Sequence, residues 1–158
     1  MQKQSNRPVD WETLVTENEN RLYRAALAIL GDRQEAQDAV QDAFLRYLEK
    51  APERLDDPAA WLMRVLVNRC RDICRRSRRR GTVPLLQELP VPGPEERQEL
   101  EELYALPPPD RAVIHLRYCE GRSTAEIARI LGVREGTVRS RLARARARLR
   151  RLLEDAER

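Results

Sequence analysis

The sequence predicts an all-α protein built from two small helical domains joined by a proline-rich linker. Apolar residues recur three and four positions apart through most of the 158 residues, which is the spacing of an amphipathic helix. The alternation of apolar and polar residues that marks a half-buried strand does not rise above chance anywhere. Between Gly81 and Pro94 the helical spacing disappears, and four of the chain's ten prolines lie there. Two helical bundles on either side of an extended connector explain all three observations.

Two capped helices open the chain. Asp10 can cap the first, and Gly31 is placed to end it. Asp32, followed three residues later by Glu35, resembles a capping box for a second helix, which should run up to Pro52. The apolar residues of each helix fall on one face, so both should pack on a common core. The first face consists of Trp11, Leu14, Val15, Leu22, Ala26 and Leu30, and the second of Ala36, Ala39, Val40, Ala43, Phe44, Tyr47 and Leu48.

A third helix should complete the N-terminal domain, residues 1–80. Asp57 supplies its cap, Pro58 suits the first helical position, and the helix should run toward Arg79. We assign Trp61 to the core rather than to a platform on which a base stacks, because it lies on the apolar stripe. Beside that stripe stand eight arginines: Arg64, Arg69, Arg71, Arg75, Arg76, Arg78, Arg79 and Arg80.

The C-terminal domain, residues 96–158, follows the linker at 81–95 and should also be helical. A short helix from about Glu95 to Leu106 ends at three consecutive prolines. Asp110 can then cap another helix. The apolar residues of that helix are Ala112, Val113, Leu116 and Tyr118.

Two helices separated by a tight turn follow. Ser123 and Glu126 form a capping box for a short helix, and Gly132 sits where a left-handed residue can end it. The chain turns through Val133 to Gly136 and continues in a long helix that begins around Glu135. These are the parts of a helix-turn-helix, whose second helix reads base edges in the major groove of duplex DNA.

The long last helix carries a basic face opposite its apolar one. Glu135 is its only acid before Glu154, so its arginines cannot all be neutralised within the helix. Unmatched positive charge along a helix suits the phosphates of nucleic acid. The alternatives are a solvated basic face or binding to anionic lipid, and the apolar side has no Trp or Phe to enter a lipid surface. The arginines are Arg139, Arg141, Arg144, Arg146, Arg148, Arg150 and Arg151.

The composition argues against several other classes. No apolar run approaches the roughly 20 residues that cross a bilayer, and no signal stretch opens the chain, so we expect a cytoplasmic protein without membrane insertion. Cys70, Cys74 and Cys119 form neither a CxxC pair nor a disulfide framework, and we expect ordinary thiols. His115 lies between apolar residues and fits the core better than catalysis. We therefore predict that the protein is not an enzyme and that it has no catalytic residue, cofactor or metal.

Motifs in both domains resemble those of one family. The N-terminal domain contains Asp38-Ala-Val-Gln-Asp-Ala-Phe44, then Trp61-Leu-Met-Arg64 and Asn68. The C-terminal domain contains Leu106-Pro-Pro-Pro-Asp-Arg111, Leu116-Arg-Tyr118, Gly121, Ser123, Glu126-Ile-Ala128, Leu131-Gly132 and Gly136-Thr-Val-Arg-Ser-Arg-Leu142. In this order they resemble the sigma-two and sigma-four domains of extracytoplasmic-function (ECF, group 4) sigma factors of the sigma-70 family. These are small bacterial promoter-specificity subunits of RNA polymerase, and the resemblance covers nearly the whole chain.

The resemblance implies a subunit that directs core RNA polymerase to promoters and helps open the DNA, and that an anti-sigma factor usually restrains. It would bind promoter DNA both as duplex and as melted single strand, and it would be nucleoid-associated within the holoenzyme. The core polymerase would be bound through Asp38, Gln41, Asp42 and Phe44. The minus-ten element would be bound by Arg64, Asn68, Arg71, Arg75 and Arg76, with Asn68 reading an extruded base. The minus-thirty-five element would be bound by Thr137, Arg139, Ser140, Arg141 and Arg144.

Several points stay open at this stage. The loop from Ala51 to Ala60 should help to form the base pocket, but no single residue of it stands out. Ala143 replaces a larger aromatic or His side chain of many relatives, so promoter preference should differ. The linker is either a tether or a segment that passes through the polymerase cleft. The alternative functions are a stand-alone helix-turn-helix regulator that binds duplex DNA without polymerase, and an RNA-binding protein, for which the chain offers no GXXG loop.

Overall fold

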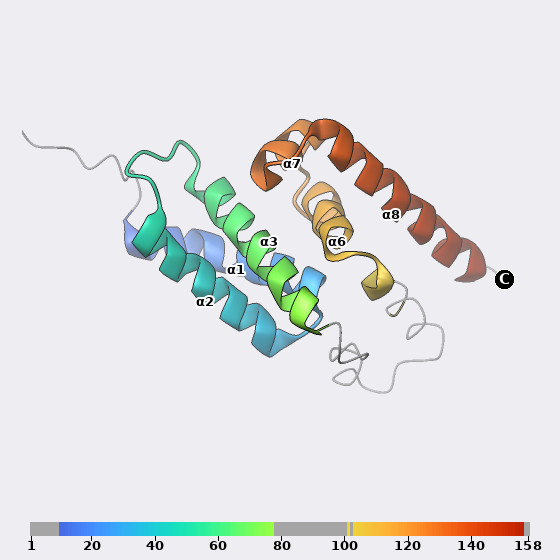
Figure 1. Cartoon of the computed structure of the whole chain (residues 1–158), viewed down its shortest axis with the longest axis horizontal. Helices are drawn as coiled ribbons and strands as arrows, with labels where there is room; N and C mark the ends of the chain where they lie inside the picture. The colour runs from blue at the N-terminus through green and yellow to red at the C-terminus, as the bar shows by residue number, and fades with distance from the viewer. Residues whose placement is uncertain (1–9, 78–100, 102, 157–158) are drawn as a thin grey trace, which may run out of the picture.

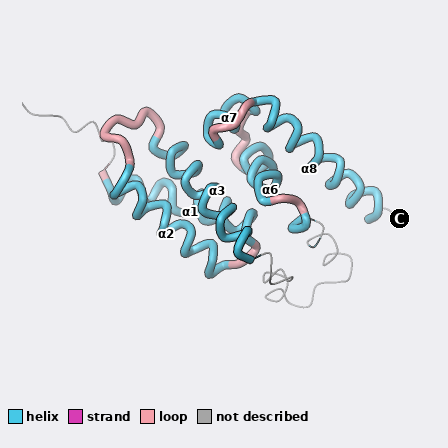
Figure 2. The backbone as a smooth tube through the Cα atoms, viewed as in Figure 1, coloured by secondary structure: helices cyan, strands magenta, loops and turns pink. Residues whose placement is uncertain are grey.

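The computed structural model describes residues 10–77, 101 and 103–156, and every regular element in these ranges is a helix (Figures 1 and 2). The prediction of an all-α fold is confirmed. The predicted linker at 81–95 lies outside the described residues. The elements are α1 (Trp11–Leu30), α2 (Arg33–Lys50), α3 (Pro58–Ser77), α6 (Pro108–Ile114), η1 (His115–Cys119, a π-helical turn), α7 (Thr124–Leu131) and α8 (Glu135–Ala156).

The helix starts in the N-terminal half follow the predicted caps. Asp10 Oδ1 accepts a hydrogen bond from the Thr13 N–H at 2.7 Å, and Asp57 Oδ1 accepts one from the Ala60 N–H at 3.0 Å. Asp32 Oδ1 accepts from the Glu35 N–H at 2.9 Å. Each bond satisfies a backbone donor that has no partner within its helix. Gly31 ends α1 in the left-handed conformation, with φ 66°.

Helices α1, α2 and α3 pack as an antiparallel bundle whose apolar faces meet (Figure 1). Two residues of the predicted apolar faces are more exposed than expected, because Trp11 is 39% and Leu48 50% exposed. The inward stripe of α2 runs through Ala36, Val40, Ala43 and Tyr47, and position 48 lies one residue further round the helix. The largest fully buried side chains of the bundle are Leu22, Ile29, Leu62, Met63 and Leu66.

The predicted cap at Asp110 is also wrong. α6 begins at Pro108, because successive prolines already hold the φ of a first helical turn and need no donor. Asp110 therefore lies inside the first turn, where its side chain is only 2% exposed. Further along, the chain widens into η1, where the Glu120 N–H donates to His115 O at 3.2 Å. Tyr118, predicted on the apolar face, is 55% exposed there.

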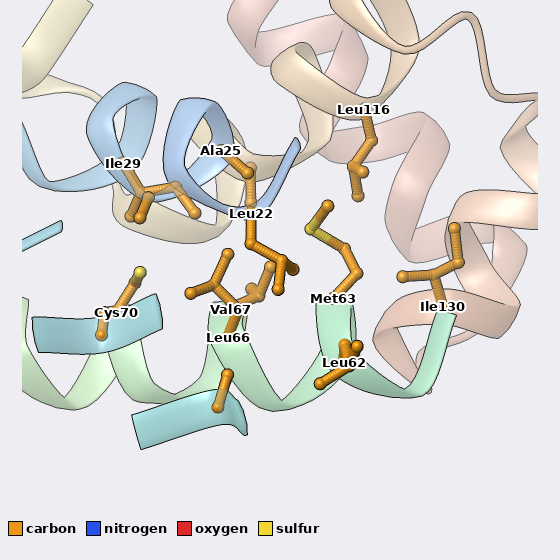
Figure 3. Packing of buried hydrophobic residues seen from close by; sticks show 14 of the residues in the cluster. Leu22, Ala25, Ile29, Leu62, Met63, Leu66, Val67, Cys70, Leu116 and Ile130 are labelled. Atoms are coloured by element: carbon orange, nitrogen blue, oxygen red, sulfur yellow. The ribbon is translucent and has the colours of Figure 1, made fainter. Parts of the chain in front are cut away.

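The C-terminal helices do not stand apart from the N-terminal bundle. α6 contacts α1 and α3, α7 contacts α3, and α8 covers α6 and α7. Figure 3 shows Met63 of α3 reaching from its helix past Leu22 toward Leu116 of η1. Buried residues of both halves thus form one continuous hydrophobic cluster.

Candidate nucleic-acid interface

The helix-turn-helix is formed by α7, the turn after it and the start of α8. Ser123 Oγ accepts from the Glu126 N–H at 3.1 Å, and Glu126 Oε1 accepts from the Ser123 N–H at 3.3 Å. The predicted capping box is therefore present, and the Ser123 hydrogen bonds lower the pKa of Glu126. Gly132 ends α7 with φ 66°, as predicted, and its N–H donates to Ala128 O. Together these bonds fix where α7 stops and how the chain enters the turn.

Glu135 ties the first turn of α8 to α7. Its Oε1 accepts from Thr124 Oγ1 at 2.9 Å and from Arg139 NH2 at 2.9 Å. A carboxylate in a first turn is also favoured by the partial positive charge at that end of a helix. The start of the helix that would enter the major groove is therefore held by a neighbouring helix, and Arg139 is held beside it.

The residues predicted for the minus-thirty-five element differ in exposure along α8. Its inner side buries Val138, Leu142 and Ala145 against the core. Arg139, Ser140 and Arg144 are exposed, whereas Thr137 and Arg141 are half-buried. Ser140 Oγ donates to Gly136 O at 3.0 Å, so this hydroxyl has a partner on its own helix. The arginines remain the groups on this face best placed to meet phosphates.

Asp110 interacts with two of these arginines, Arg144 and Arg141. Arg144 NH2 donates to Asp110 Oδ1 at 3.1 Å, although the two residues are far apart in sequence. Burial lowers the pKa of Arg141; the charge of Asp110 opposes this effect, and those of Arg71 and Arg144 add to it. Arg71 belongs to α3, so the charged faces of α3 and α8 come within electrostatic reach of each other.

Four of the five residues predicted for the minus-ten element form one stripe along α3, and Arg76 lies beside it. Arg64, Asn68, Arg71 and Arg75 follow one another by four, three and four positions, which is one face of a helix. Asn68, Arg64, Arg75 and Arg76 are exposed and Arg71 is half-buried. The guanidinium of Arg64 lies against Gly132, where an added Cβ would be 2.6 Å from Cζ. One end of the stripe therefore touches the turn of the helix-turn-helix.

The residues predicted to bind core polymerase divide into two groups. Asp38 and Gln41 are exposed on α2, whereas Asp42 is half-buried and its Oδ2 accepts from Arg69 Nε of α3 at 2.7 Å. Phe44 is 8% exposed and meets Trp11 edge to face, with ring centroids 5.8 Å apart. The structure thus places Phe44 in the core and not on the outer face.

Sequence reasoning did not identify Leu45 and Leu48 as surface residues. They are 55% and 50% exposed and extend the line of Asp38 and Gln41 along α2. The spacing of the sequence could have indicated this surface, because positions 38, 41, 45 and 48 share one face of a helix. Two exposed leucines beside acidic and amide groups are typical of a protein-binding surface.

The remaining candidate groups take no part in these surfaces. His115 is 7% exposed, which confirms its assignment to the core, and burial lowers its pKa. Burial raises the pKa of Cys70 and of Cys74, so neither is an activated thiol. Trp61 is half-buried and meets Tyr47 edge to face at 5.7 Å, as the core assignment requires. In the described ranges no group of His, Cys, Asp or Glu could hold a metal ion, and none of the described helices is long and apolar enough to cross a bilayer.

Two parts of the chain match profiles of known protein families. Residues 14–80 match the family profile described as Sigma-70 region 2, and residues 97–149 match the one described as Sigma-70, region 4. The chain is 39% identical over 150 residues to the ECF RNA polymerase sigma factor SigM of Mycobacterium tuberculosis, covering 90% of this chain and 76% of the relative. It is 35% identical over 161 residues to the RNA polymerase sigma-E factor of Streptomyces avermitilis, covering 94% and 88%.

Among solved structures, the chain resembles the sigma factor RpoE from Bartonella quintana, determined in complex with the anti-sigma factor NepR. The TM-score is 0.68 and the identity 24%, with 92% of this chain and 97% of that chain covered. This likeness establishes a shared helical fold.

Proposed function

This chain belongs to the extracytoplasmic-function sigma factors of the sigma-70 family, and from that premise we propose how its residues divide the work of promoter recognition. It directs core RNA polymerase to promoters and is not a stand-alone regulator. Residues 1–80 act on the minus-ten element and core polymerase, residues 96–158 act on the minus-thirty-five element, and residues 81–95 connect them. The observation that carries this division is the presence of two separate basic helix faces, on α3 and on α8.

On DNA, α8 binds the minus-thirty-five duplex and α3 binds the minus-ten element as it opens. Arg139 and Arg144 contact phosphates or base edges from the outer side of α8, with Arg139 held near the helix start by Glu135. Asn68 has an exposed amide between Arg64 and Arg71, so it can offer a donor and an acceptor to an extruded base while the arginines hold the strand. Extruding a base costs a few kcal/mol, which these contacts must offset.

On core polymerase, the contact surface is the outer stripe of α2. It consists of Asp38, Gln41, Leu45 and Leu48. Asp42 contributes from the edge, because its carboxylate is shared with Arg69. Phe44 supports the stripe from beneath by packing on Trp11. A combination of exposed apolar side chains with neighbouring polar and charged ones is common in protein interfaces.

Three further parts complete the proposal. The protein performs no catalysis of its own and needs no cofactor. It acts in the cytoplasm, where its polymerase is. It has an anti-sigma factor as a partner, as RpoE of Bartonella quintana has in its solved complex.

Run-off transcription with core polymerase on a genomic promoter library tests the proposal. We expect products that start downstream of a shared pair of promoter elements, and co-purification of the chain with core polymerase. The chain without core polymerase is the control and should bind free duplex only weakly. Strong duplex binding without any product would instead support a regulator that works alone.

A further inference from the structure

Tyr118 and Arg146 form a pair on the surface of the C-terminal domain. Tyr118 lies in η1 and is 55% exposed, and Arg146 is exposed on α8. Arg146 Nε donates to the Tyr118 hydroxyl at 2.6 Å. The same guanidinium lies over the tyrosine ring, with its Cζ 5.8 Å from the ring centroid. A hydrogen bond and a cation–π contact between the same two side chains therefore hold an exposed arginine in a defined position.

The pair leaves donors of both side chains for a ligand. Every nitrogen of a guanidinium carries N–H groups, and among the described residues the Arg146 side chain donates only through Nε. The Tyr118 oxygen accepts that bond, so its own O–H hydrogen can donate elsewhere. The terminal N–H groups of Arg146 and the O–H of Tyr118 can therefore donate to neighbouring oxygens of one anion.

The surroundings of the pair favour an anion as the ligand. Between Glu135 and Glu154, α8 contains no acid, and η1 contains none either. The residue after η1 is Glu120, whose side chain is 9% exposed and whose Oε2 accepts from Arg21 NH2 at 2.9 Å. No carboxylate of η1 or of this part of α8 therefore competes with a ligand for the pair.

The place of Arg146 on α8 indicates which anion the pair would meet. Arg139, Ala143 and Arg146 follow one another by four and three positions, so they share one face of the helix. At a rise of about 1.5 Å per residue, Arg146 stands about 16 Å along the axis from Glu135. The major groove of DNA is only about 12 Å wide. A helix whose first turn reaches the base edges therefore brings Arg146 to the level of the sugar-phosphate backbone.

We propose that Tyr118 and Arg146 form a binding site for a backbone phosphate of duplex DNA, next to the bases that the start of α8 reads. Arg146 supplies the positive charge, and Tyr118 both holds the guanidinium and donates its hydroxyl to the same phosphate. A phosphate contact reads no base, so the site adds affinity and fixes register without adding sequence preference. The site rests on the proposed binding of α8 to the minus-thirty-five duplex.

Fluorescence anisotropy of the full chain on a labelled duplex with the minus-thirty-five element, at several salt concentrations, tests the site. Arg146→Gln should weaken binding about tenfold and lower the salt slope by about one unit, because one phosphate contact is lost. Tyr118→Phe keeps the ring and removes the hydroxyl, so it should weaken binding about threefold. Its salt slope should stay close to that of the wild-type chain, since no charge is lost. In the Arg146→Gln background, Tyr118→Phe should have a smaller effect, because part of its role is to hold the guanidinium.

Two matched variants control for the loss of a charge and of a hydroxyl. Arg46→Gln changes an exposed arginine of α2, and Tyr23→Phe changes a half-buried tyrosine of α1. Both should bind the duplex as the wild-type chain does. Urea unfolding of the Tyr118 and Arg146 variants should give the wild-type midpoint, because both side chains are exposed.

A second measurement identifies the ligand as a phosphate. In a series of duplexes, one backbone phosphate at a time is replaced by a neutral methylphosphonate. One position should weaken binding of the wild-type chain and have no effect on binding of Arg146→Gln. Wild-type affinity in both single variants would overturn the site, and so would the absence of any phosphate position whose effect depends on Arg146.

The outcomes also separate this site from the proposed function. Variants that bind the duplex normally but co-purify poorly with core polymerase would assign the pair to a protein contact and overturn the phosphate site. In that case run-off products from the wild-type chain would leave the proposed function standing. A wild-type chain that yields no run-off product and binds no duplex would overturn the proposed function and this site together.

Discussion

Arg144 of α8 and Asp110 of α6 form an ion pair in which the two partners differ sharply in burial. Arg144 NH2 donates to Asp110 Oδ1 at 3.1 Å, and the side chains are 64% and 2% exposed, respectively. A buried carboxylate without a partner is costly, so Asp110 depends on this arginine. The other donors of the guanidinium stay available to DNA phosphates. One side chain therefore serves both the fold and the proposed DNA contact.

Replacing Arg144 with Ala should cost about 1–2 kcal/mol of unfolding free energy, because Asp110 loses its donor while the exposure of Arg144 limits the loss. Arg139→Ala is the matched control. Arg139 pairs with Glu135, but the side chains are 68% and 41% exposed, so its loss should cost less than about 0.5 kcal/mol. Both changes should lower the salt slope of duplex binding by about one unit. Equal destabilisation of the two variants in urea would contradict the role given to Asp110.

Three glycines allow backbone strain to be separated from contact with Arg64. Gly121 and Gly132 have φ 67° and 66°, but an added Cβ meets nothing within 4 Å at Gly121, whereas at Gly132 it meets the Arg64 guanidinium. Gly121→Ala should cost about 1–2 kcal/mol of unfolding free energy through strain alone. Gly132→Ala should lower the free energy of unfolding by more than this, because the new Cβ must also displace the Arg64 side chain.

Gly136 is the control of the set, because it lies inside α8 and a Cβ there meets nothing within 4 Å. Gly136→Ala should leave the protein as stable or stabilise it by up to about 1 kcal/mol. Chemical unfolding of all three variants measures the differences. A loss at Gly132 no larger than that at Gly121 would mean that Arg64 does not rest on the turn in solution.

The features that sequence predicted well are local ones. The caps at Asp10 and Asp32, the capping box at Ser123 and the left-handed Gly132 depend on residues a few positions away, so their spacing is visible in the chain. The start of α8 at Glu135 was predicted from the turn that follows Gly132.

Most of the features that sequence missed are decided by residues distant in the chain. Asp110 was predicted to cap α6, but the neighbouring prolines start that helix earlier. Arg144, which is distant in the chain, is the partner of Asp110 instead. Phe44 was predicted both on the apolar face and in the polymerase-binding motif; its burial against Trp11 confirms the first assignment, and the second stays a prediction. The pair between Arg21 and Glu120 has no local signature at all, because neither residue lies in a recognisable motif. The surface of α2 was found only in part, since the exposure of Leu45 and Leu48 depends on how the bundle packs.

The proposed polymerase surface predicts that Asp38→Arg weakens binding to core polymerase at least tenfold. Asp38 is exposed, so the free energy of unfolding should change by less than about 0.5 kcal/mol. Asp38→Arg is a more specific test than Asp42→Arg. The Asp42 variant would also break the hydrogen bond from Arg69, so it should weaken both the binding of core polymerase and the packing of α2 on α3. Glu17→Arg on α1, another exposed acid, is the control for charge and should bind core polymerase normally. Co-purification measures both, and normal binding by the Asp38 variant would move the interface away from α2.

The proposed base reader predicts a defect in DNA opening that is separate from polymerase binding. Asn68→Ala removes an exposed amide, so it should leave stability and core binding unchanged while reducing the permanganate reactivity of the open minus-ten region. Asn20→Ala, at an exposed position of α1, is the matched control and should open the promoter normally. A footprint identical to wild type in the Asn68 variant would remove that residue from the base pocket.

The single histidine predicts how stability should depend on pH. Burial lowers the pKa of His115 below its ordinary value of 6.5; the Glu120 carboxylate opposes this effect, and the charges of Arg24 and Arg21 reinforce it. As pH falls below about 6.5, the unfolded chain binds a proton on His115 before the folded chain does, so the unfolded state is favoured. The folded protein should therefore lose stability as the pH falls from neutral through about 6.5 toward the lowered pKa of His115, and no further loss from this group is expected below that folded pKa. In His115→Gln, which cannot titrate, urea unfolding should give a shallower pH dependence across that window. A slope as steep as that of the wild-type chain would place the responsible group elsewhere.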